Sequence, residues 1–320
     1  MDGSKRIVVI IVAMFLVTQL IGLVILSIYS PKEVLIQDSD GNMTNSTSYN
    51  LPYGFDKPAT SSPQSSLFSI LIALVFAIFL MFFFMKYHFE SIIRIWFFIV
   101  VVIATSLTFN AIITKIPGVI YATLIALVLA VPLAYIKVFK RNILVHNFTE
   151  LLIYPGIAAI FVPWFNIITI SLLIILICVY DIYAVWHSGF MQRMASYQIK
   201  KIRVFGGFLI PYMGKKERLI LSKIKAMKLK DSEKNKKIKS AKIKINIAVL
   251  GGGDIVWPMI LAGVVLNTFG LFSALLICLG ATLALAYLLL TGEKGKPYPA
   301  MPYISTGIFI ALAIIYLINI

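Results

Sequence analysis

Charged side chains are scarce in this sequence. Only 13% of its 320 residues are charged, whereas 60% are hydrophobic and the mean hydropathy is +0.94. A soluble domain has about 25% charged residues, so this chain has too little charge to cover a soluble fold of its length. Disordered and coiled-coil chains are excluded for the same reason. The composition therefore predicts a polytopic membrane protein.

Cysteine and histidine are also rare. Cys178 and Cys278 both lie inside apolar runs, which argues against a disulfide framework and predicts small buried side chains. The three histidines, His88, His146 and His187, are scattered and lack the spacing of metal ligands. The His-Glu-x-x-His motif of zinc proteases is absent. We therefore expect neither a metal nor another cofactor.

Long apolar runs dominate the sequence instead. A run of about 20 mostly apolar residues is long enough to cross a bilayer as a helix. None of the runs alternates polar and apolar residues, so a β-barrel is rejected. The first run is too long for a typical signal peptide and is expected to remain as an anchored span. The clear runs are residues 7–29, 67–85, 92–113, 118–136, 245–269, 271–290 and 302–320.

Residues 151–186 leave two interpretations open: one long kinked span, or two short spans joined at 163–166. The charge distribution distinguishes them, because residues 191–244 hold 17 Lys and Arg and only three acids. Two spans place this loop on the side that carries 26 of the 29 basic residues, as the positive-inside rule prefers. The sequence thus predicts an all-α polytopic membrane protein of nine transmembrane helices, with the N-terminus cytoplasmic and the C-terminus outside.

The predicted spans divide the chain into three parts. Residues 1–186 hold helices 1 to 6 with an external loop at 30–66, residues 187–244 form a basic cytoplasmic loop, and residues 245–320 hold helices 7 to 9. The basic loop lacks the aromatic interleaving typical of nucleic-acid binding. We therefore expect it to lie near anionic lipid and to bind no nucleic acid. Its apolar patch at 204–213 either lies on the membrane or folds over a site as a flap.

Two acids, Asp181 and Asp254, are predicted to lie well inside spans. The sequence places the other acids in loops or at span ends, and places no lysine or arginine well inside a span. A carboxylate at mid-bilayer costs on the order of 3 kcal/mol, so an unpaired acid there indicates a function. Both acids are expected in the cytoplasmic half of consecutive antiparallel helices, an arrangement that allows them to face each other.

Two opposed carboxylates in a medium of low dielectric constant share one proton. One then acts as general base on a water molecule, while the protonated one donates to the carbonyl under attack. This is aspartic-protease chemistry. The alternative is a proton- or cation-coupled transporter or channel that uses the two acids, to which Asn110 and Asn267 near span ends would contribute.

The residues next to the two acids favour a peptide substrate. Glycines at 251–253 precede Asp254, and glycine lets another backbone approach a membrane helix closely. Tyr180 precedes Asp181 and offers a hydroxyl group. Three prolines at 297–302 predict extended backbone, which is tolerated at membrane depth where it lines a cavity.

These residues resemble the motifs of a known family, the presenilin and signal peptide peptidase intramembrane aspartyl proteases of the GxGD type. Tyr180-Asp181 resembles the Tyr-Asp motif of the sixth span, and Gly251-Gly252-Gly253-Asp254 resembles Gly-x-Gly-Asp of the seventh. Pro299-Ala300-Met301 resembles the Pro-Ala-Leu motif at the ninth, with Met in place of Leu. The resemblance implies that Asp181 and Asp254 are the catalytic pair. It implies substrate binding by Tyr180, Gly251, Gly253, Pro299, Ala300 and Met301.

The resemblance also implies the substrates and the location. The sequence combines presenilin-like orientation with signal-peptide-peptidase-like residues after Asp254, and this short chain is similar to archaeal homologues. We therefore expect hydrolysis of peptide bonds within single-span transmembrane proteins or signal-peptide-like substrates, in the cell membrane of a prokaryote. Presenilin itself works with partner subunits and is cut within its long loop.

Overall fold

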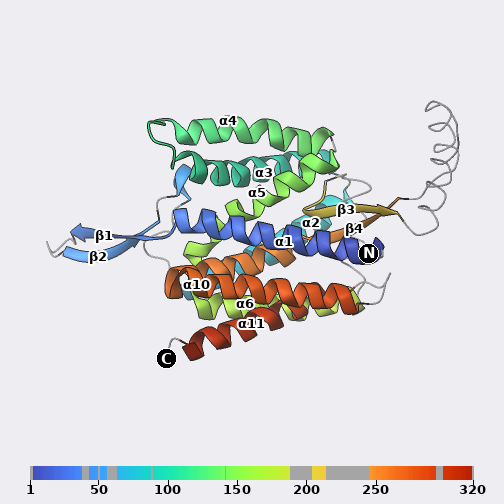
Figure 1. Ribbon diagram of the computed structural model, residues 1–320. Helices are drawn as coiled ribbons and strands as arrows, with labels where there is room; N and C mark the ends of the chain where they lie inside the picture. The colour runs from blue at the N-terminus through green and yellow to red at the C-terminus, as the bar shows by residue number, and fades with distance from the viewer. Residues whose placement is uncertain are drawn as a thin grey trace, which may run out of the picture.

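The computed structural model describes residues 3–37, 43–49, 51–55, 63–87, 89–140, 142–187, 204–213, 245–292 and 298–318. Most of these residues are helical, and the helices run side by side as a bundle (Figure 1). In the described part of the chain, eight helices are long and apolar enough to cross a membrane. They are α1 (Gly3–Ile28), α2 (Pro63–Lys86), α3 (Glu90–Ile113), α4 (Ala122–Tyr135, continued by a π-helical turn, Ile136–Lys140), α5 (Ile143–Phe161), α6 (Ile167–Ile182), α10 (Gly253–Thr291) and α11 (Ala300–Ile318).

The segment that left two interpretations open contains two helices. α5 ends at Phe161, a short 3-10 turn spans Val162–Trp164, and α6 begins at Ile167. Asn166 caps α6, because its side chain accepts the backbone N–H of Thr169 at 2.8 Å while the Thr169 hydroxyl accepts the Asn166 N–H at 3.0 Å. Such a reciprocal capping box fixes the start of a helix. The prediction of two helices here is confirmed.

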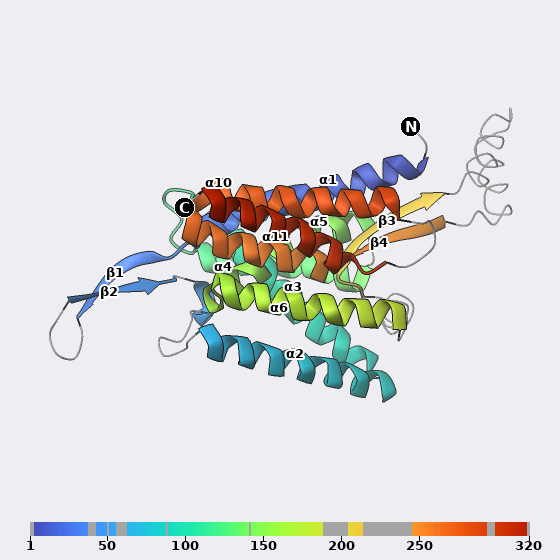
Figure 2. The ribbon, with the colours of Figure 1, turned by 90° about the horizontal axis from the view of Figure 1, so that it is seen from below.

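Helix α10 is broken in its middle. Gly270 has φ 83° and ψ −179°, a conformation that is essentially restricted to glycine. The buried Gln19 of α1 contacts both runs of α10: its Nε2 donates to the Ile255 carbonyl at 2.9 Å, and its Oε1 accepts from the Cys278 thiol at 4.0 Å. Ile255 and Cys278 would lie about 34 Å apart in a straight helix. α10 therefore folds back on itself at Gly270, as Figure 2 also shows.

Two antiparallel β-hairpins lie at opposite ends of the bundle (Figure 1). The prediction of an all-α chain is therefore wrong in this respect, because hairpin pairing joins segments that no local periodicity identifies. The loop at 30–66, which was predicted to be external, is described except for 38–42, 50 and 56–62. The strands are β1 (Lys32–Gln37) with β2 (Met43–Ser48), and β3 (Gly207–Met213) with β4 (Ile245–Gly251).

Strand β4 corrects a second prediction. Residues 245–269 were expected to form one helix, but residues 245–251 are extended and α10 begins only at Gly253. The stretch from Ile245 to Leu250 is rich in β-branched residues, which favour strands, and β3 supplies its hydrogen-bond partners. β3 is the apolar patch of the basic loop. The rest of that loop, at 188–203 and 214–244, lies outside the described residues.

The buried charges correct a third prediction. Because α5 begins at Ile143, Glu150 lies within a helix and is only 1% exposed. Lys137 of the π-helical turn is 4% exposed and forms an ion pair with it. Asp181 and Asp254 are therefore not the only acids well inside the spans. Lys137 itself lies near the end of its span, which runs to Lys140.

The two termini of the chain lie at opposite ends of the bundle (Figures 1 and 2). The N-terminus is at the end where β3 and β4 lie, and the C-terminus is at the end where β1 and β2 lie. Termini at opposite ends are what an odd number of passes of the chain along the bundle produces.

Candidate active site

Asp181 lies near the C-terminal end of α6 and is 3% exposed. Its Oδ2 accepts the backbone N–H of Met301 at 3.2 Å. Met301 is in the first turn of α11, where N–H groups have no partner within the helix and the helix dipole is positive. The start of α11 thus supplies a donor for the carboxylate of α6.

Asp254 lies in the first turn of α10 and is 8% exposed. One residue, Gly252, separates the end of β4 from α10, and its N–H donates to the Gly206 carbonyl at 3.1 Å. The β-hairpin therefore determines where α10 begins and where its first acid is placed.

The structure brings the two aspartates into one buried region. α6, α10 and α11 pack against one another, and both carboxyl groups are buried among these helices. Two carboxyl groups that are buried close together can hold a single proton between them. The arrangement is suited to general acid–base chemistry on a bound water molecule.

The three motif glycines have different surroundings. A Cβ atom on Gly251 would lie 3.1 Å from Oδ2 of Asp254, and a Cβ on Gly252 would lie 3.0 Å from the hydroxyl of Tyr154. Both distances are tighter than ordinary contacts. Gly253 is exposed, and a Cβ there would meet the Trp257 ring only at 3.9 Å. Two of the glycines therefore make room for the protein's own side chains, and the third leaves open space.

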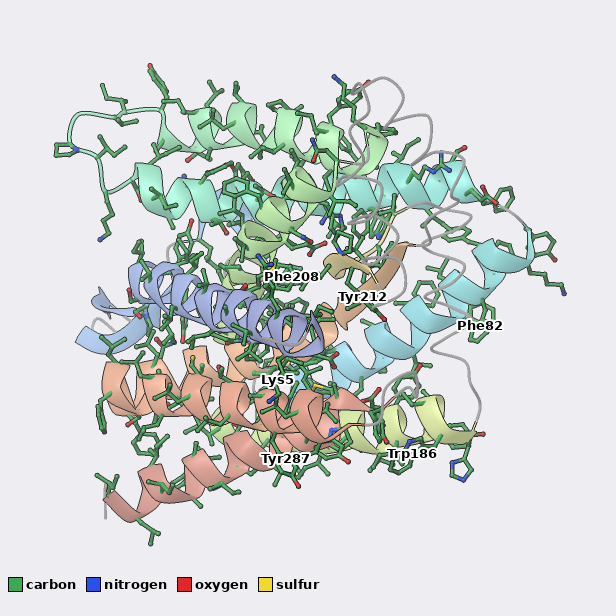
Figure 3. The ribbon with its side chains drawn as sticks, turned by 45° about the vertical axis from the view of Figure 1, so that its right-hand side comes forward. Lys5, Phe82, Trp186, Phe208, Tyr212 and Tyr287 are labelled. Atoms are coloured by element: carbon green, nitrogen blue, oxygen red, sulfur yellow. The ribbon has the colours of Figure 1, made fainter. Side chains whose placement is uncertain are left out.

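The Pro299-Ala300-Met301 segment lies beside Asp181. Pro299 is buried and non-helical, whereas α11 already begins at Ala300. The extended backbone is thus shorter than the prolines suggested, because Pro302 fits the first turn of a helix, where its missing N–H is not needed. A groove of about 650 Å³ borders this segment and is lined by Pro299, Pro302, Ile182, Trp186 and Tyr287, the last two of which are labelled in Figure 3.

Tyr180 differs from its neighbour in exposure. Its side chain is 42% exposed on α6, so its phenol does not share the buried environment of Asp181. Of the residues that the motifs single out, Asp181, Asp254, Gly251, Pro299 and Met301 surround the buried region, and Tyr180 and Gly253 lie on its exposed side.

Sequence reasoning missed a further link between α6 and α11. The thiol of Cys178 donates to the hydroxyl of Ser305 at 3.0 Å. Cys178 is about one turn before Asp181, and Ser305 is about one turn after Met301. The Cys178–Ser305 bond therefore joins α6 and α11 one turn away from the Asp181–Met301 bond. Helical spacing from the motif residues could have indicated this pair.

Within the described part of the chain, no group of three or more His, Cys, Asp and Glu side chains could hold a metal ion. The chemistry-bearing groups of the buried region are the two carboxyl groups.

A family model matches most of the chain. The model, described as signal-peptide peptidase, presenilin aspartyl protease, covers residues 43–319. The chain belongs to this family. It is accordingly an aspartic endopeptidase that acts within the membrane, and the predicted membership of this family is confirmed.

Two solved structures are similar to this chain. One is a presenilin family intramembrane aspartate protease in space group C222. It is 16% identical in sequence, its TM-score is 0.58, and the match covers 97% of this chain and 99% of that chain. The other, from the P2 space group, is 17% identical, with a TM-score of 0.57, over 96% of each chain. At this level of sequence identity, the structural similarity establishes the fold alone. A search of curated proteins finds no match.

Proposed function

We propose that Asp181 and Asp254 form the catalytic dyad and hydrolyse peptide bonds within transmembrane helices of membrane-protein substrates, with water as the nucleophile. The observation that carries this proposal is the burial of both carboxyl groups where α6, α10 and α11 pack together, with Asp181 bonded to the start of α11. The Met301 N–H stabilises the charge of Asp181. Asp181 is therefore suited to carry the negative charge and Asp254 to carry the shared proton in the resting enzyme.

The reaction needs two proton transfers. The ionised carboxylate removes a proton from water as the water oxygen attacks the scissile carbonyl carbon, and the protonated carboxyl group donates to the carbonyl oxygen. When the C–N bond of the resulting tetrahedral diol breaks, the leaving amine takes the proton that the first carboxylate received from water, and the second carboxylate takes a hydroxyl proton from the diol as the product carboxyl group forms. The dyad then again holds one proton, so the cycle leaves the enzyme unchanged.

The substrate helix must unwind near the cut, because its scissile carbonyl is otherwise hydrogen-bonded within the helix. Space beside exposed Gly253 and the non-helical backbone at Pro299 support binding of such an extended segment. Single-span transmembrane proteins and signal-peptide-like segments have the required form. We assign substrate contact to five residues next to the dyad, namely Tyr180, Gly253, Pro299, Ala300 and Met301, and assign Gly251 to making room for the Asp254 carboxyl group.

We further propose that the two runs of α10 cross the membrane separately. The chain then crosses nine times, which agrees with termini at opposite ends of the bundle. The N-terminus and the basic loop at 187–244 would lie in the cytoplasm, with the lysines near anionic lipid. The cell membrane is the expected location in a prokaryote.

Replacement of each aspartate tests the proposal. Asp181→Asn and Asp254→Asn preserve side-chain size but cannot exchange the proton, so cleavage of a labelled single-span peptide in liposomes should be lost in each variant. Glu90→Gln, which removes an acid from the start of α3, is the matched control and should cleave normally. Cleavage by either aspartate variant would refute the dyad. Ion flux by a wild-type protein that cleaves no peptide would favour the transporter.

A further inference from the structure

A second buried polar group of side chains lies outside the dyad, on the side of α5 that faces β3. We call Lys137, His146, Asn147, Glu150 and Tyr154 the Glu150 cluster. Glu150 is paired with Lys137, and Nε2 of His146 lies 3.5 Å from its Oε1. The side chains of Lys137 and Glu150 are each only 1% exposed.

The cluster forms hydrogen bonds with the first half of one edge of strand β3, at Gly207 and Leu209. Glu150 Oε1 accepts the Gly207 N–H at 3.2 Å, and His146 Nε2 donates to the Gly207 carbonyl at 2.8 Å. Asn147 accepts the Leu209 N–H at 3.0 Å and donates to the Leu209 carbonyl at 2.9 Å. The opposite edge of β3 pairs with β4. Side chains of α5 thus occupy the position that a third strand would take at this edge.

The contacts continue from β3 to Asp254. The Gly206 carbonyl accepts the N–H of Gly252, which lies directly before the first turn of α10. Gly207 has φ +147°, and a Cβ there would clash with the Leu250 carbonyl of β4. The two strands therefore meet closely next to the dyad, and a shift of β3 would move Gly252 and the start of α10.

Tyr154 connects the cluster to the dyad directly. Its ring packs edge-on against Phe208 with centroids 6.0 Å apart, and its hydroxyl lies over Gly252. Figure 3 shows Phe208 in the interior of the bundle. The buried hydroxyl of Tyr154 thus lies beside the residue two positions before Asp254.

We propose that the Glu150 cluster positions Asp254 for catalysis by holding β3, with Glu150 as the central positioning residue. The inference rests on the proposed catalytic role of Asp254. A buried ion pair can often be replaced by apolar residues without loss of stability. Apolar residues cannot accept the Gly207 N–H. The acceptor oxygen, rather than the charge, is therefore the property that the active site needs.

Two double variants separate the oxygen from the charge. Lys137→Met with Glu150→Gln removes both charges but keeps an oxygen for Gly207, whereas Lys137→Met with Glu150→Leu removes both charges and the oxygen. Neither leaves an unpaired buried charge. Cleavage of a labelled single-span peptide in liposomes gives kcat and KM. Hydrogen exchange of peptides 204–213 and 245–253 measures how stable the hydrogen bonds of the β3–β4 hairpin are.

The glutamine variant should retain kcat within about threefold of the wild type. The leucine variant should lose about 10- to 100-fold in kcat, the effect of a misplaced catalytic group, with KM within about twofold of the wild type. Both hairpin peptides should exchange faster in the leucine variant than in the glutamine variant. Wild-type kcat in the leucine variant, or an equal loss in both variants, would overturn the proposal.

Two further samples complete the test. Wild type and Asp254→Asn are measured in parallel: a silent wild type or an active Asp254→Asn refutes the dyad, while hydrogen exchange still reports on the hairpin. Asn147→Ala removes the two bonds to Leu209 from a half-buried position, and it replaces the leucine variant if that protein does not fold. It should lower kcat several-fold at unchanged KM, and an unchanged kcat would overturn the proposal.

Discussion

At the scale of single residues, the glycines before Asp254 differ in what they adjoin. Gly251 adjoins the carboxyl group of Asp254, and Gly252 adjoins Tyr154, whereas Gly253 is exposed. One sequence motif therefore combines internal packing at its first two positions with open space at its third. Alanine substitution should separate these roles.

Gly251→Ala should lower kcat by about tenfold or more, because the new methyl group pushes against Oδ2 of Asp254 and displaces a catalytic group. Gly253→Ala should leave the Tm unchanged and raise KM, because its methyl group enters the open space assigned to substrate. Kinetics on a labelled transmembrane peptide, together with thermal unfolding, measure both effects. Identical kinetic changes in the two variants would contradict this division.

The pH dependence of cleavage follows from the shared proton. Asp181 and Asp254 are active when the pair holds one proton, since catalysis needs one base and one acid. Activity should fall at low pH as the base becomes protonated, and fall at high pH as the acid loses its proton. A plot of kcat/KM against pH in liposomes should be bell-shaped. A profile without an acidic limb would argue against a carboxylate base.

The sequence predicted the two aspartates because an unpaired acid stands out in an apolar run. It did not predict Glu150, because that residue directly precedes the apolar stretch 151–186 and the sequence places it at a span end. Its partner, Lys137, lies on a separate helix, and no periodicity joins the two. Pairing across helices is a tertiary property.

At the scale of elements, Gly270 determines the path of α10. Its φ of 83° with ψ near 180° reverses the helix and brings Ile255 and Cys278 to the same glutamine. Hydropathy predicted the boundary between the runs at 269 and 271, because both runs are apolar and of spanning length. It could not distinguish strand from helix at 245–251, since a short apolar run is compatible with either.

Gly270→Ala should destabilise the protein by about 1–3 kcal/mol, because a side chain disfavours this backbone conformation. Leu271→Ala, at the adjacent exposed position, is the matched control and should change stability little. Thermal unfolding in detergent measures both. Equal Tm values for Gly270→Ala and wild type would show that the reversal does not depend on glycine.

At the scale of the whole molecule, the nine crossings that we propose would place the two hairpins, which lie at opposite ends of the bundle, on opposite sides of the membrane. Two single-cysteine variants, Tyr121→Cys and Tyr212→Cys, show on which side of the membrane each position lies. Both are made in a protein in which Cys178 and Cys278 are replaced by alanine. An impermeant thiol reagent should label Tyr121→Cys in intact cells and label Tyr212→Cys only after permeabilisation, because positions 121 and 212 lie at opposite ends of the bundle. Labelling of both positions in intact cells would contradict the topology.

The β3–β4 ladder has a consequence for the continuity of the chain. Met213 and Ile245 are paired, so the segment between them is closed at its base. A single break within that segment would separate a fragment with Asp181 from a fragment with Asp254. The ladder, the bonds from Gln19 to both runs of α10, and the Met301–Asp181 bond would still join the fragments. These contacts join the two parts of the chain independently of the segment between Met213 and Ile245.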